Sequence, residues 1–176
     1  MDYDTDVPPP PPWTGPPHDQ LPGATAAGII LGRGPHTVVA LNPLRCFPSG
    51  VELTLSVRTA SPVLGLYARV MGRDPAFGTR VDGALHWAFA LADGTTLSAD
   101  YLSDGELGPT LTARTSEGTD GAVDATYWLA PLPLVGPVTL VCSWREHGIV
   151  ETTTSLDVNE IRDAAARSLS LLNATI

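Results

Sequence analysis

The chain has 176 residues and a formal net charge of −9, with ten basic residues that are all arginine. An acidic chain without a basic stripe cannot neutralise a phosphate backbone, which excludes nucleic acid as an expected partner and disfavours a membrane surface. A hydrophobic content of 43%, with 17 prolines and 17 glycines, is typical of one globular domain built from short elements joined by turns.

Residues 1–20 are rich in proline, and we expect them to form a disordered leader. The prolines between Pro8 and Pro17 favour the polyproline II conformation. Trp13 beside them leaves open a second interpretation, in which the leader binds an aromatic groove of a partner. Residues 21–176 are predicted to form a single β domain.

From residue 21 onward, alternation of apolar and polar residues predicts antiparallel strands. The clearest is 51–59, in which Val51, Leu53, Leu55 and Val57 face the core. Asp93-Gly94 predicts a hairpin turn, because a type I′ turn needs positive φ. The expected strands are 28–33, 37–41, 51–59, 85–92, 95–102, 110–115, 122–129, 137–144 and 149–156. Eight to nine strands predict an all-β fold, an antiparallel β-sandwich.

Two segments break this alternation and predict helical structure. Between residues 62 and 72, helical spacing predicts a short helix or an irregular crossover, with an apolar side formed by Leu64, Tyr67, Ala68 and Met71. The second segment is a C-terminal α-helix over 158–172, for which Asp157 and Asn159 compete as N-cap. Its predicted apolar stripe is Ile161, Ala164, Ala165, Leu169 and Leu172. We expect this helix to cover a sheet edge or one end of the sandwich, with partner binding as the alternative.

The tip between the last two strands is the candidate interaction site. It consists of Trp144, Arg145, Glu146 and His147, followed by Gly148. Tryptophan and arginine are enriched at interface hot spots, and loop tips often carry function. The alternative is a polar hairpin turn in which Trp144 folds back onto the core.

A sheet face bearing aromatic residues is the candidate surface for another class of function. Trp87, Phe89, Tyr101 and Tyr127 could together bind a small ligand or a carbohydrate if they were exposed to solvent. Burial of these side chains would remove that interpretation.

The sequence predicts no catalytic residue, no cofactor and no metal site. The histidines are scattered, and there is no G-x-S-x-G, no Walker loop and no C-x-x-C. We therefore expect a non-catalytic protein that acts in protein–protein interaction or as a structural module. Its expected partner is an unidentified protein, and a homo-oligomer is left open.

The compartment is predicted from the lack of a long apolar stretch and from the acidic N-terminus. No stretch reaches the roughly 18 apolar residues needed to span a bilayer, and acidic residues stand where a secretory signal would be basic. This predicts a cytoplasmic protein with free thiols at Cys46 and Cys142. The order Cys46, Trp87, Cys142 is that of immunoglobulin domains, but both gaps are too long for that pattern, which favours two buried thiols.

Several blocks of the sequence resemble a group of small actinobacterial β-sandwich proteins. They are LRCFPSGVELTL at 44–55, ALADG at 90–94, YWLAPLP at 127–133, Gly136-Pro137 and CSW at 142–144. The chain departs from the group where Leu134-Val135 replaces a typical proline and Leu140 a typical phenylalanine. No activity is known for the group, so the resemblance implies a β fold and an actinobacterial source and transfers no site residue.

Overall fold

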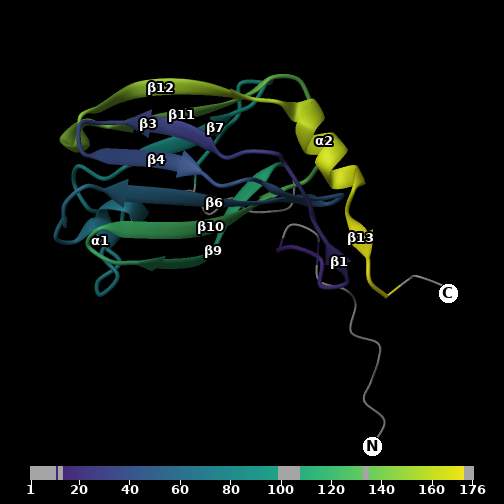
Figure 1. The fold of residues 1–176 in the computed structure, drawn as a ribbon, viewed down its shortest axis with the longest axis horizontal. Helices are drawn as coiled ribbons and strands as arrows, with labels where there is room; N and C mark the ends of the chain where they lie inside the picture. Colours follow the sequence, from purple (N-terminus) through teal and green to yellow (C-terminus); the bar gives the residue numbers. More distant parts are fainter. Residues whose placement is uncertain (1–10, 12–13, 99–107, 133–134, 173–176) are drawn as a thin grey trace, which may run out of the picture.

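The computed structural model describes residue 11 and residues 14–98, 108–132 and 135–172, and in it two antiparallel sheets pack against each other (Figure 1). The strands are β1 Gln20–Leu21, β2 Gly23–Ala24, β3 Ile29–Arg33, β4 Thr37–Leu41, β5 Arg45–Phe47, β6 Gly50–Thr59, β7 His86–Ala90, β8 Thr96–Leu97, β9 Thr110–Gly118, β10 Ala122–Ala130, β11 Val138–Trp144, β12 Ile149–Leu156 and β13 Leu169–Ser170. The helices are α1 Leu66–Met71, the 3-10 turn η1 Arg145–His147 and α2 Val158–Ala166. The predicted all-β sandwich with a C-terminal helix is confirmed.

The long strand β6 is the centre of the larger sheet. The order in that sheet is β2-β5-β6-β10-β9, with β4 also paired to β6 and β3 paired to β4. The smaller sheet has the order β12-β11-β7-β8. As predicted, Val51, Leu53, Leu55 and Val57 of β6 face the core, where each is at most 1% exposed.

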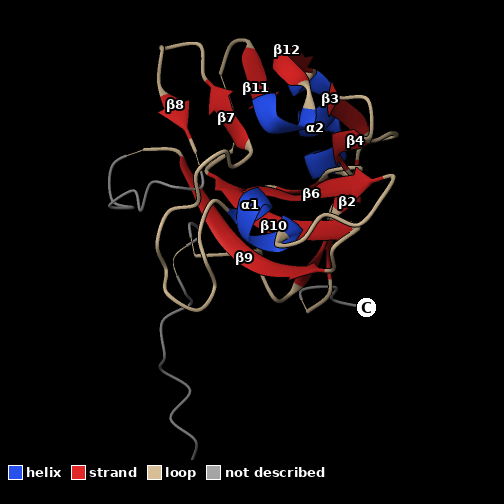
Figure 2. Cartoon of the chain, turned by 90° about the vertical axis from the view of Figure 1, so that its left-hand side faces the viewer, coloured by secondary structure: helices blue, strands red, loops and turns tan. Residues whose placement is uncertain are grey.

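The two helices lie at opposite ends of the sandwich, as Figures 1 and 2 show. The predicted short helix is present, but its apolar side is only partly as predicted. Tyr67 and Met71 are partly buried against the core, whereas Leu64 is 88% exposed and the buried residues are Leu66 and Val70. Gly65, with φ +71°, precedes the first helical residue and leaves Leu64 outside the helix.

The C-terminal helix is shorter than predicted. The Asp157 carboxylate caps it by accepting hydrogen bonds from the amides of Asn159 (2.9 Å) and Glu160 (3.2 Å), as the sequence indicates. The helix ends at Ala166 rather than at residue 172, because the following residues are extended and form β13.

Strand β13 pairs with β1 in a two-stranded ribbon at the same end of the sandwich as α2 (Figure 1). Gln20 lies opposite Ser170 and Leu21 opposite Leu169. The pairing continues for one residue, because the Leu171 amide donates to the Asp19 carbonyl (2.7 Å). Backbone pairing with β1 therefore replaces the last turns of the predicted helix.

Two loops differ in how well the sequence predicts them. The hairpin at Asp93-Gly94 is confirmed, but its turn is not the predicted type I′, because only Gly94 has positive φ (+87°). The Leu91 amide donates to the Thr95 carbonyl (2.8 Å), which leaves residues 92–94 in the loop. The strand predicted over 110–115 extends to Gly118, so the connection from β9 to β10 begins only at Thr119. Part of the predicted strand 95–102 lies outside the described residues.

Part of the predicted leader has defined contacts. Thr14–Gln20, called the strap below, runs along the larger sheet, and the Arg114 guanidinium of β9 donates to the Thr14 carbonyl (2.8 Å). Residues 1–10 and Trp13 lie outside the described residues. No helix in the described ranges is long and apolar enough to cross a membrane.

Candidate functional site

The tip places Trp144 inside the protein. Its side chain is 1% exposed, and its indole N–H donates to the carbonyl of Gly83 (2.8 Å). Gly148 closes the turn with φ +71°, a conformation that favours glycine. The exposed residues of the tip are therefore Arg145 and Glu146, and the tryptophan that suggested a hot spot cannot reach a partner without local opening.

The remaining tip residues tie three elements together. The imidazole of His147 lies against the Trp144 ring, with centroids 3.8 Å apart, and its Nδ1 is 2.8 Å from the buried Thr37 hydroxyl of β4. Glu146 forms an ion pair with Arg69 of α1. Burial and the Arg69 charge lower the pKa of His147, against the opposing effect of Glu146. The contacts of the tip are those of a structural joint between the two sheets and α1.

The predicted aromatic binding face is wrong. Trp87, Phe89 and Tyr127 are 6%, 1% and 2% exposed, and their rings pack edge to face in the core between the sheets. Their strand neighbours include Ala88, Ala90 and Trp128, which are also apolar, so alternation could not tell which side of each strand faces water. Tyr101 lies outside the described residues. The carbohydrate-binding alternative thus loses the surface on which it rested.

Both cysteines are buried free thiols, as predicted. Burial raises the pKa of Cys142 to about 11. Burial, followed by the charge of Glu160, raises the pKa of Cys46 to about 11 as well. A thiol is nucleophilic only as the thiolate, so neither side chain is poised for covalent chemistry.

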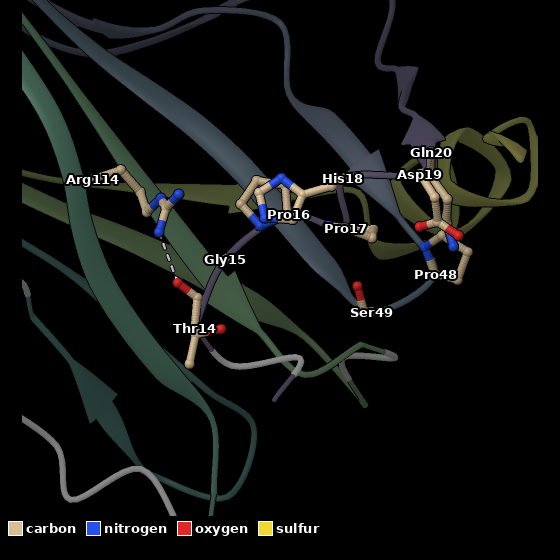
Figure 3. A pocket seen from close by; sticks show the side chains of 10 residues that line it. All are labelled: Thr14, Gly15, Pro16, Pro17, His18, Asp19, Gln20, Pro48, Ser49 and Arg114. Carbon is tan, nitrogen blue, oxygen red and sulfur yellow. Dashed lines mark hydrogen bonds between the residues drawn. The ribbon is translucent and has the colours of Figure 1, made fainter. Parts of the chain in front are cut away.

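A pocket of about 540 Å³ lies between the strap and the larger sheet (Figure 3). Its lining consists of the strap, Pro48, Ser49 and Arg114. Arg114 packs against Gly15 so closely that a Cβ there would lie 2.7 Å from Nη1. The guanidinium is thus engaged by the strap backbone and fastens the strap to β9.

The chemistry available in this strap pocket is limited. His18, Asp19 and Ser49 all line it, but the buried Ser49 hydroxyl has no hydrogen-bond partner among the described residues. An activated serine needs a base within hydrogen-bond reach, and that contact is not formed here. Across the described ranges, no group of three or more histidine, cysteine or acidic residues could hold a metal ion.

A second hollow, of about 450 Å³, lies on the polar outer face of the larger sheet. It is lined by Asn42, Thr54, Thr115, Ser116, Glu117, Asp124 and Thr126. Its groups largely bond one another, since the Thr54 and Thr126 hydroxyls are 3.1 Å apart and Arg58 binds both oxygens of Asp124. Burial raises the pKa of Asp124, but hydrogen bonds from Arg58 and Ser56 and the Arg58 charge outweigh it, and the pKa is lowered. We call this hollow the polar groove and interpret it as part of the solvated face of the larger sheet.

The β1–β13 ribbon presents apolar side chains to solvent. Leu21 and Leu169 are directly paired, and Leu171 lies two residues beyond Leu169, so strand alternation puts all three on one side. They are 49%, 63% and 51% exposed. We call these three residues the leucine face. Gln20 alternates to the other side and lines the strap pocket, whereas Ser170 opposite it is exposed.

The leucine face is the surface that the sequence interpretation missed. Helical spacing in the sequence predicts that Leu169 and Leu172 belong to the apolar stripe of a longer helix. In the structure both side chains are exposed, that of Leu172 to 79%. The signal was present, because Ser168-Leu169-Ser170-Leu171 alternates with the period of a strand. Nothing in Gln20–Leu21 indicates its partner strand, which is almost 150 residues away.

Comparison with known proteins identifies no relative of this chain. No protein-family model matches the chain, and no curated protein or solved structure matches it significantly. The resemblance to small actinobacterial proteins therefore stays a prediction.

Proposed function

We propose that this protein is a non-catalytic protein–protein interaction module whose contact surface is the leucine face. The observation that carries the proposal is the exposure of Leu21, Leu169 and Leu171 side by side on one ribbon. Single exposed leucines are ordinary on protein surfaces, but a contiguous group is typical of interaction sites.

The ribbon is also an element that benefits from being covered. A two-stranded ribbon is marginal in water, and most of its support comes from whatever packs on its faces. On one side Gln20 lines the strap pocket, whereas the leucine face on the other side is open. A partner on the leucine face would complete the packing of the ribbon.

The leucine face can contribute only a limited part of the free energy of binding. Complete burial of a leucine is worth about 1.5–3 kcal/mol, so covering three half-exposed leucines supplies roughly 2–5 kcal/mol. Association costs about 4–15 kcal/mol, because the partners lose translational and rotational freedom and side chains at the interface become ordered. The leucine face is therefore the centre of a larger contact, surrounded by polar residues.

A capture experiment with matched variants tests the proposal. Leu169→Asp places a charge in the leucine face, and Val150→Asp makes the same change at a residue of β12 that is 79% exposed. We expect extracts of the source organism to yield proteins that bind the wild type and Val150→Asp but not Leu169→Asp. Identical sets of bound proteins for both variants would contradict the proposed function.

A further inference from the structure

We infer that the partner of the leucine face is a second copy of this chain, bound across a two-fold axis. The inference rests on the proposed function and specifies its partner. Three observations favour it: the chemistry of the face, the state of the ribbon strands, and the charges at its two ends.

The leucine face is one place where two copies can meet without repulsion. Each copy has a net charge of −9, so most approaches bring like charges together. The three leucines carry no charge and are equally suited to a copy of themselves. A two-fold axis places the same patch on both sides of the contact, which requires such self-complementarity.

The strands of the ribbon have no further partner in the part of the chain described. β1 and β13 form a separate two-stranded sheet and pair only with each other. A second ribbon packed on the first would give two layers of two strands, with the six leucines between them. The leucine face of each ribbon would then be covered.

Opposite charges flank the leucine face at its two ends. Asp19 lies opposite Leu171, whose amide donates to the Asp19 carbonyl. At the other end, the exposed Arg167 precedes Leu169 by two residues, and its guanidinium donates one hydrogen bond to the Ala24 carbonyl (2.9 Å), which leaves its other N–H groups for a partner. A two-fold axis perpendicular to the strands reverses one ribbon relative to the other. Arg167 then lies towards the partner's Asp19 at both ends, whereas the parallel arrangement would bring like charges together.

Sedimentation equilibrium of the full chain over about 10 µM to 1 mM tests the inference, a range suited to weak association. We expect the wild-type average mass to rise from that of the monomer towards that of a dimer. Leu169→Asp should raise the dissociation constant at least about tenfold, because two like charges meet at the axis. Val150→Asp, with the same charge change outside the face, should alter it less than about twofold.

Charge reversal at the ends tests the arrangement. Arg167→Asp should weaken the dimer, and adding Asp19→Arg to that variant should restore at least half of the lost affinity. A wild type that stays monomeric throughout, or equal effects of Leu169→Asp and Val150→Asp, overturns the inference. If the chain is monomeric but the capture experiment still separates the two variants, the proposed function holds and the partner is a different protein.

Discussion

His147 contacts Trp144 and Thr37 through one imidazole ring, and its environment makes the stability of the protein dependent on pH. The ring lies against Trp144, bonds Thr37 and lies near Arg69. Burial and the Arg69 charge both disfavour the imidazolium and lower the pKa of the folded state below the ordinary 6.5. The unfolded chain therefore binds a proton more readily than the folded one.

The sign of the pH dependence follows from that difference. The contribution of neutral His147 is complete above about pH 6.5 and is lost as the pH falls through the interval below it. In urea denaturation from pH 7 to pH 5, we expect the wild type to lose stability and His147→Gln to lose less. His36→Gln, at an exposed histidine, serves as the control and should follow the wild type. Equal slopes for all three proteins would contradict this account of the tip.

At the scale of elements, the cap of α2 was predictable whereas its end was not. Asp157 and Glu160 stand at capping-box spacing, and the carboxylate accepts two backbone hydrogen bonds as that spacing predicts. The end at Ala166 depends on pairing with Leu21, a contact distant in sequence. Local spacing therefore locates a helix start, whereas tertiary pairing decides where this helix stops.

The cap of α2 gives a prediction at this scale. Asp157→Ala should destabilise the protein by about 1 kcal/mol, because two amides of the first turn lose their acceptor. Asp163→Ala, at an exposed position inside the same helix, should cost little, because alanine is the better helix former. Chemical denaturation of both variants measures the difference. Equal losses would mean that the cap contributes nothing beyond helix propensity.

At the scale of the whole molecule, the sequence predicts the core better than the surface. Alternation in β6 identifies Val51, Leu53, Leu55 and Val57 as core residues, because burying one face of a strand leaves a local pattern. Pairing of distant segments leaves no such pattern, and the leucine face is built from two of them. Residue type alone also misplaced Trp144 and Trp87, which fill the core instead of facing a partner.

The central proposal for the whole molecule is that two copies of the chain meet at the leucine face. Backbone amide shifts, recorded by NMR from dilute to concentrated protein, test this residue by residue. We predict concentration-dependent changes centred on residues 19–21 and 169–172, with the tip at 145–147 unchanged. Changes at the tip or over the polar groove, with 169–172 unaffected, would contradict it.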